Sequence, residues 1–168
     1  MNTNKNLIFK KVTGEVIQNV EKYVKDWVKE NPYGKIIVGC DSQMHGRRIK
    51  YSIIIVMHYI DRMSIGHGAH LLVCDIWEKR NARMPIDEMS TKLWKEAEYA
   101  LQTAQLVNGK DEFFKQRIEV HLDINSDEKY GSNFMYAAGV GLLQSAGYLA
   151  KGKPFAKMAS NCADHFCR

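Results

Sequence analysis

The stretch Lys35-Ile-Ile-Val-Gly-Cys-Asp-Ser-Gln43 predicts the middle strand of a sheet, followed directly by a candidate functional residue. Residues 36 to 38 are three consecutive β-branched residues without polar alternation, a pattern typical of a strand that is covered on both faces. Asp41 is then expected at the carboxyl end of this strand. Ligands bind at that edge of an α/β sheet, because loops and helix ends leave a crevice there. Since an aspartate after a strand also forms turns and caps, the rest of the chain has to decide its role.

The composition is that of one folded domain with an excess of positive charge. With 168 residues, 45% of them hydrophobic, the chain is long enough to bury a sizeable core, and the composition disfavours disorder. The formal net charge of +5 favours polyanionic partners such as nucleic acid. No apolar stretch has the length of a signal-peptide core or a membrane span. We therefore expect a cytoplasmic protein without membrane contact.

The cysteines and the common motifs narrow the chemistry. In the cytoplasm the four cysteines are expected to be reduced thiols. Cys162, His165 and Cys167 lie close together and suggest zinc, but a zinc finger has a second closely spaced Cys/His pair, which is missing, so we interpret them as small buried residues. The sequence also has no Walker loop, no Gly-x-Ser-x-Gly elbow and no Gly-x-Gly-x-x-Gly fingerprint. P-loop nucleotide hydrolysis, serine hydrolysis and dinucleotide redox chemistry are therefore disfavoured.

The hydrophobic patterns predict an α/β fold with a mixed five-stranded sheet, in which three antiparallel strands are followed by parallel crossovers. We expect helices on both faces and an extra N-terminal helix, with residues 1–33 as a helical extension and residues 34–168 as the domain. After the first strand, the expected elements are strands at 49–60 and 70–77, a helix at 85–108, a strand at 117–125, a helix at 132–146, an edge strand at 148–158 and a short final helix. A helix capped by Thr13 precedes them and ends at Asn31.

Acidic residues recur where these elements reach one edge of the sheet. Asp123 lies near the end of an alternating strand, and a parallel crossover would place it beside Asp41. Glu96 and Glu98 both flank the apolar side of the helix at 85–108, and a helical wheel does not decide between them. Asp164 falls in the first turn of the last helix. Each has an ordinary alternative as a loop cap, a surface glutamate or a partner of the helix dipole.

Basic residues are expected at the same edge. Arg47 and Arg48 lie in the predicted turn at 44–47, and Lys79, Arg80 and Arg83 follow the third strand. Strands one and three of an antiparallel meander end on the same side, so these cations would lie beside Asp41. They could grip phosphates, or be a chance solvated cluster.

Several carboxylates at one edge favour a metal site. Closely packed carboxylates resist ionisation unless divalent cations neutralise them. Ligation by oxygen alone suits Mg²⁺ or Mn²⁺, and two such ions can activate a water and stabilise the leaving oxygen of a phosphodiester.

Four motifs carry a resemblance to a known family. Gly39-x-Asp41-Ser42-Gln43-x-His45, Leu93-Trp94-x-Glu96, His121-Leu122-Asp123-Ile124-Asn125 and Ala163-Asp164-His165 are similar to the YkuK-type family of predicted ribonuclease-H-like proteins in bacteria. The likeness covers roughly residues 34 to 168, and the strand order with its acids resembles the ribonuclease-H-like superfamily. It is this resemblance that selects Glu96 over Glu98.

The resemblance implies roles for the individual residues. Asp41 would bridge two metal ions, Asp123 and Glu96 would complete the two sites, and Asp164 would hold the second ion. The crevice would be lined by Ser42, Gln43, His45 and Asn125, with His45 or His165 helping the product to leave. The implied activity is a metal-dependent nuclease acting on RNA, DNA or a hybrid. For such an enzyme we expect the basic residues of the same edge, Arg47, Arg48, Lys79, Arg80 and Arg83, to grip phosphates.

Two other functions remain open at this point. A non-catalytic nucleic-acid-binding module would keep the fold and the basic edge without turnover. A protein-interaction domain would instead use its N-terminal helix to bind a partner.

Overall fold

The computed structural model of the chain describes residues 7–80, 85–127, 129 and 133–167. These residues form a mixed six-stranded sheet in the order β1-β4-β3-β2-β5-β6. Strands β2, β3 and β4 are antiparallel neighbours, and β5 and β6 add in parallel beside β2. The bounds are β1 Lys10–Lys11, β2 Lys35–His45, β3 Arg48–Ile60, β4 Gly66–Lys79, β5 Ile118–Asn125 and β6 Leu149–Lys153. The predicted mixed α/β sheet is confirmed at this level.

The predicted number of five strands is wrong, because β1 adds a sixth at the free edge of β4. Its two residues pair with Val73 and Leu72. A strand of two residues is too short to produce the alternating pattern by which strands are recognised in a sequence.

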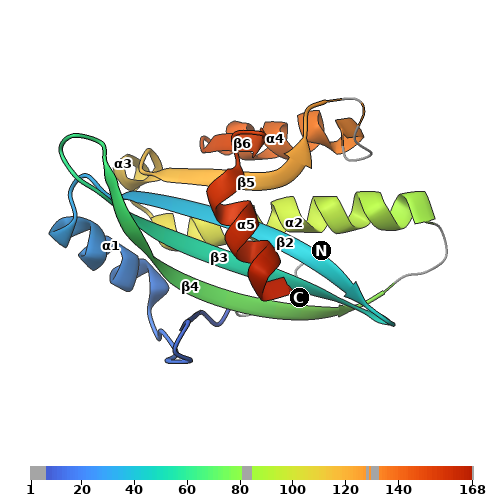
Figure 1. Ribbon diagram of the computed structural model, residues 1–168, viewed down its shortest axis with the longest axis horizontal. Coiled ribbons are helices and arrows are strands. Elements are labelled where there is room, and N and C mark those ends of the chain that lie inside the picture. The colour runs from blue at the N-terminus through green and yellow to red at the C-terminus, as the bar shows by residue number, and fades with distance from the viewer. Residues whose placement is uncertain (1–6, 81–84, 128, 130–132, 168) are drawn as a thin grey trace.

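Helices cover both faces of this sheet. Figure 1 shows α5 lying across the front of the sheet, whereas α2 runs behind it. The bounds are α1 Val20–Glu30, α2 Pro85–Asn108, α3 Glu112–Lys115, the 3₁₀ turn η1 Asn133–Met135, α4 Tyr136–Ser145 and α5 Lys157–Cys167. The larger core lies on the side of α1, α2 and α4, where Ile53 of β3 packs among residues of these helices. A smaller core lies under α5 and joins Ala163 to Ile54 and Val73.

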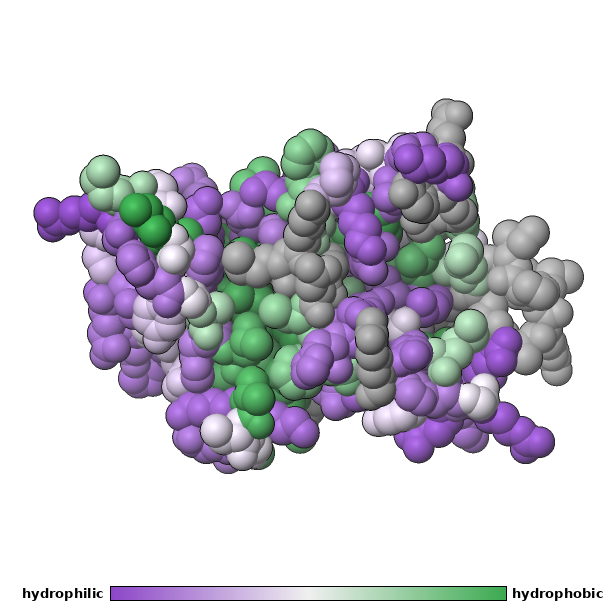
Figure 2. Space-filling model, viewed as in Figure 1, coloured by the Kyte–Doolittle hydropathy of each residue, from purple (hydrophilic) through white to green (hydrophobic). Residues whose placement is uncertain are grey.

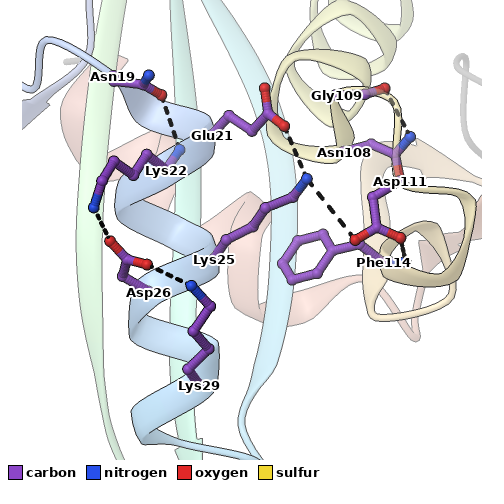
Figure 3. A network of polar contacts seen from close by, with 10 residues as sticks. All are labelled: Asn19, Glu21, Lys22, Lys25, Asp26, Lys29, Asn108, Gly109, Asp111 and Phe114. Carbon is purple, nitrogen blue, oxygen red and sulfur yellow. Dashed lines mark hydrogen bonds and ion pairs between the residues drawn. The ribbon is translucent and has the colours of Figure 1, made fainter.

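Helix α1 begins later than its sequence pattern predicts. Asn19, rather than Thr13, caps it by accepting a hydrogen bond from the backbone N–H of Lys22 at 2.9 Å. Figure 3 shows an ion pair between α1 and the segment that follows α2, in which Lys25 lies 3.9 Å from Asp111. Within α1, the same lysine donates a hydrogen bond to Glu21 at 2.8 Å. The buried side chains of α1 belong to the larger core. The apolar face that a partner protein could have used is thus covered by this chain itself.

The first hairpin is tighter, and its strands longer, than predicted. Strand β2 continues past Asp41 to His45, because β3 pairs with it over the whole length from His45↔Arg48 to Lys35↔His58. The turn is reduced to Gly46 and Arg47, and Gly46 has a φ of +58°, which two-residue hairpin turns require and glycine supplies at little cost. Asp41 therefore lies inside a strand, several residues from the turn.

The C-terminal elements also differ from the prediction. The strand predicted at 148–158 ends at Lys153, and α5 begins at Lys157. The short strand leaves room for an 11-residue helix that packs on the sheet through Ala163 and Cys167, which are at most 1% exposed. In the part of the chain that the structure describes, no helix has the length and apolar character needed to traverse a membrane.

Candidate carboxylate site

Asp41 and Asp123 are neighbours on adjacent parallel strands. The last paired residues of β2 and β5 are Cys40 and Leu122, and each aspartate is the next residue along its strand. Cys40 and Leu122 point into the larger core, so the alternation of a strand directs both aspartates to the opposite face, which α5 covers. The arrangement expected from the parallel crossover, with the two carboxylates side by side, is thus present.

The last helix brings a third carboxylate to this face. Asp164 follows the buried Ala163 of α5, and its charge raises the pKa of Asp41. The helix is held in place at its end, because the Cys167 thiol donates to the backbone oxygen of Asp41 at 3.1 Å. Helix α5, which carries Asp164, is therefore hydrogen-bonded to the main chain of Asp41.

The environment of Asp41 disfavours its charged form. Burial is the largest cause that raises its pKa, and the charges of Asp123 and Asp164 raise it further. The backbone N–H of Ser42, which donates to Asp41 Oδ1 at 2.8 Å, and the charge of Lys92 lower it. The net effect is a raised pKa, as expected for a buried carboxylate that shares a site with other carboxylates.

Glu96 reaches the same region from the other face of the sheet. Glu96 is 1% exposed, and its side chain accepts a hydrogen bond of 2.5 Å from the hydroxyl of Ser42, which the alternation of β2 turns toward α2. Burial raises the pKa of Glu96 to about 8, and the charges of Asp41 and Asp123 contribute, against the lowering effect of Lys92, whose Nζ lies 3.6 Å away. Glu98 points elsewhere: it accepts from Trp94 Nε1 at 3.0 Å and lies 3.9 Å from Lys95.

A lysine that the sequence patterns did not single out lies among these acids. Lys153, the last residue of β6, forms an ion pair with Asp123. The hydrogen bond to Asp123 raises the pKa of Lys153, and the charges of Asp41 and Asp164 raise it further. Its ammonium group thus partly neutralises the carboxylate cluster, by which we mean Asp41, Glu96, Asp123 and Asp164. Because β6 was predicted only as a weak edge strand, no periodic signal placed this lysine beside Asp123.

The predicted basic residues gather at the tip of the hairpin, beyond the carboxylate cluster. A pocket at this tip is lined by Trp77 and by four basic residues, Arg47, Arg48, Lys79 and Arg80. Asp41 pairs with Ser52, so it lies well inside the strand rather than at the turn. Figure 2 shows the side of the molecule that α5 covers. Hydrophilic residues lie at the end where the β2–β3 hairpin is, and apolar surface lies nearer the middle. Arg83 lies outside the described residues.

The remaining predicted residues fall into separate environments. His45 is exposed at the end of β2, where Nε2 donates to the backbone oxygen of Cys167 at 3.1 Å. His165 is exposed on α5 with its ring against Phe166. Gln43 is exposed on β2 between Asp41 and His45. Asn125 ends β5 and accepts from the backbone N–H of Asp127 at 3.0 Å.

The donor atoms suit a divalent cation in kind, although they do not yet enclose one. The four carboxylates, whose charges help to raise the pKa values of Asp41 and Glu96, offer the oxygen ligands that Mg²⁺ and Mn²⁺ prefer. Among the described residues, however, no group of three or more acidic, histidine or cysteine side chains is placed so that it could hold a metal ion. In place of a metal ion, Asp123 has the ammonium group of Lys153 beside it, and Glu96 is buried against Ser42.

The comparison with known proteins gave one match. The family model described as Ribonuclease H-like matches residues 15–168. This range includes strands β2 to β6 and every residue of the carboxylate cluster, and leaves out only β1 among the strands of the described residues. No curated protein and no solved structure matches the chain.

Proposed function

Because this chain belongs to the ribonuclease H-like family, we propose that it is a nuclease that depends on divalent metal ions and hydrolyses phosphodiester bonds in nucleic acid. The observation that carries the proposal is the placement of Asp41 and Asp123 side by side on β2 and β5, with Asp164 brought to the same face by α5. These residues come from three distant parts of the chain, and their like charges are unfavourable unless a cation joins them. Membership of the YkuK-type subfamily is compatible with the family match and remains a prediction.

Asp41, Asp123 and Asp164 would hold Mg²⁺ or Mn²⁺, and Glu96 would join them once it is ionised. When bound, two such ions activate a water and stabilise the leaving oxygen of a phosphodiester. The role of this chain's own residues follows from their contacts. The Ser42 backbone fixes one oxygen of Asp41, and the Ser42 hydroxyl fixes one oxygen of Glu96. At neutral pH Glu96 keeps its proton, since its pKa is about 8.

Lys153 competes with a metal ion for Asp123, because its ammonium group occupies Oδ1 of that carboxylate and would repel a divalent cation bound beside it. The lysine side chain is 42% exposed, so it has room to move into solvent. We infer that Lys153 stabilises the carboxylate cluster while it holds no metal, and that substrate and metal together displace it.

Cleavage of labelled single-stranded, duplex and hybrid oligonucleotides with Mn²⁺ tests the proposal. We expect Asp41→Asn to lower the rate by about 100-fold or more, a size typical of losing one group that stabilises transition-state charge. The matched control is Asp75→Asn, which removes an acid on the same side of the sheet that is bound by Ser52 at 2.7 Å and lies 3.4 Å from Lys50. The proposal fails if the wild type cuts nothing, or if Asp41→Asn cuts as fast as wild type.

One observation favours a second function, that of a nucleic-acid-binding module without catalysis. Lys153 supplies an internal cation where the nuclease proposal needs a metal. A binding module would bind oligonucleotides in the presence of a chelator, with an affinity that falls steeply with salt and is the same after Asp41→Asn. Absence of any binding at low salt would exclude it.

A further inference from the structure

The tip of the β2–β3 hairpin forms a pocket that combines an aromatic ring with several cations. The pocket has a volume of about 770 Å³ and is built from the turn and from the end of β4. The residues on which the argument depends are Arg47, Arg48, Trp77, Lys79 and Arg80. We call these five residues and the space they enclose the hairpin-tip pocket.

Trp77 is an exposed aromatic residue in a setting that hydrophobic packing does not explain. It is 41% exposed at the end of β4, although its neighbour Ile76 is buried in the larger core. The guanidinium carbon of Arg48 lies 4.8 Å from the centre of the indole ring, and the ring of His45 lies 5.3 Å from it at an angle of 57°. An indole and a guanidinium group that stack on each other form a broad, flat and positively charged surface.

The charges of Arg47, Arg48 and Lys79 are not cancelled by Glu78, the acid that borders the hairpin-tip pocket. Glu78 is turned toward α2, where it accepts a hydrogen bond from the hydroxyl of Tyr99 and lies 3.8 Å from Lys95. Within the described part of the chain, no acidic side chain forms an ion pair with Arg47, Arg48 or Lys79. These three exposed residues therefore present their positive charge to solvent.

We propose that the hairpin-tip pocket binds unpaired bases of single-stranded nucleic acid. The proposal rests on the proposed function in taking nucleic acid as the ligand, and it adds which form of nucleic acid is bound. Bases that are not in a duplex offer a free face, which stacks on aromatic rings and guanidinium planes. Trp77 and Arg48 supply such planes, while Arg47 and Lys79 lie beside them as partners for the phosphates.

The hairpin-tip pocket lies on the same face of the sheet as Asp41. Asp41 and Gln43 are alternate residues of β2 and share that face. Trp77 pairs with Lys50, which pairs with Gln43, so the indole lies two residues along the strands from Asp41, about 7 Å at about 3.3 Å per residue. The end of α5 contacts β2 here, because Cys167 bonds to both His45 and Asp41. A nucleic-acid strand whose base stacks at Trp77 would thus run along the end of α5 toward Asp41.

Binding to an oligonucleotide that lacks bases separates stacking from phosphate attraction. We would measure fluorescence anisotropy with a labelled single strand of 12 nucleotides, with an abasic strand of the same length and with a duplex, all in EDTA. We expect wild type to bind the normal strand about 5- to 150-fold more tightly than the abasic strand, the range for stacking of one base. We expect Trp77→Ala to lose this preference and Trp77→Phe to keep part of it.

Two control variants make the result specific. Trp94→Ala removes another tryptophan of similar exposure, 36%, from α2 and should leave the preference unchanged. Arg47→Ala, in the exposed turn, should weaken binding of both strands by the same factor. Equal affinity of wild type for normal and abasic strands, tighter binding of the duplex, or equal losses in Trp77→Ala and Trp94→Ala would overturn the inference. Because the assay contains no metal and needs no cleavage, it can succeed when the nuclease proposal fails, and fail when that proposal holds.

Discussion

The carboxylate cluster and the hairpin-tip pocket share strand β2 and have opposite physical properties. At Asp41 the strand is covered by α5, the nearby acids outnumber the lysines Lys92 and Lys153, and burial raises the pKa of the carboxyl group. Four residues further on, at His45, the strand is exposed and its neighbours are positive. One strand thus connects a buried, electrostatically unfavourable region with an open, electrostatically attractive one.

The difference teaches which features serve chemistry and which serve binding. Groups that hold metal ions or move protons profit from burial, because a low dielectric strengthens each interaction and shifts each pKa. Groups that collect a polyanion from solution have to remain accessible and charged. Burying acids in the carboxylate cluster lowers the free energy of unfolding. The exposed cations of the hairpin-tip pocket have no such effect.

Glu96→Gln should show that cost most clearly. The folded protein keeps the proton on Glu96 up to a pH of about 8, whereas the unfolded chain releases it near the ordinary value of 4.5. The unfolded state therefore binds fewer protons between these pH values, and the contribution of Glu96 to the free energy of unfolding falls as pH rises. The loss amounts to at most about 5 kcal/mol, at about 1.4 kcal/mol per pKa unit. Glutamine has the same shape and no such dependence.

Urea denaturation at pH 5 and pH 8 measures this effect. We expect the variant to gain stability relative to wild type on going from pH 5 to pH 8, by a few kcal/mol. Glu98→Gln is the control, because Glu98 lies two residues away in contact with Trp94 and Lys95, and it should follow wild type. An equal pH dependence in wild type and Glu96→Gln would show that Glu96 is ionised in the folded protein.

Lys153→Ala should make the carboxylate cluster bind metal ions more tightly. Without the lysine, a metal ion no longer has to displace an internal positive charge from Asp123. Partly exposed ion pairs are worth up to about 1 kcal/mol, so we expect Mn²⁺ to bind about fivefold more tightly in calorimetric titration. Lys151→Ala, on the same strand but paired with Glu119 at 2.6 Å, should change nothing. Weaker binding of Mn²⁺ to Lys153→Ala would mean that the lysine supports the ion rather than competing with it.

The positions of Asp41 and Asp123 could be predicted from the sequence, because the patterns of their strands are strong signals. The apolar run at 36–38 placed β2, and the alternation at 118–124 placed β5 and the side to which Asp123 points. A whole helix between two strands implies a parallel crossover, and this was enough to expect Asp41 beside Asp123. The choice of Glu96 required the family resemblance, since both Glu96 and Glu98 flank the apolar side of the helix and a helical wheel does not show which of them is buried.

The features that sequence reasoning missed depend on tertiary contacts with weak local signals. The pairing of β1 with β4 involves two residues, and the ion pair of Lys153 depends on the register of β6 beside β5. The extent of β2 beyond Asp41 follows from its pairing with β3, and this moved the basic turn away from the acids. Trp77 was predicted only as the end of a strand, because nothing in its neighbourhood indicates that Arg48 would stack on it.

Lys79→Ala tests the weakest link of the comparison, the assignment of phosphate binding to the hairpin tip. A lysine that neutralises one phosphate of a single strand releases counterions, so the slope of log K against log salt should become shallower by about 0.7. The affinity at physiological salt should fall only a few-fold, since one such contact is largely screened there. Anisotropy titrations of the same 12-nucleotide strand between 50 and 200 mM salt, about the range where screening varies strongly, supply the slope.

The control for this variant is Lys29→Ala, which removes an exposed lysine from α1, at the opposite end of the sheet from the hairpin in Figure 1. Both variants lower the net charge of the protein by the same amount. A purely general attraction between a basic protein and a polyanion therefore predicts the same change of slope for both. If Lys29→Ala changes the slope as much as Lys79→Ala does, the positive charge acts as a whole, and the division of β2 into a chemical region and a binding region has no electrostatic basis.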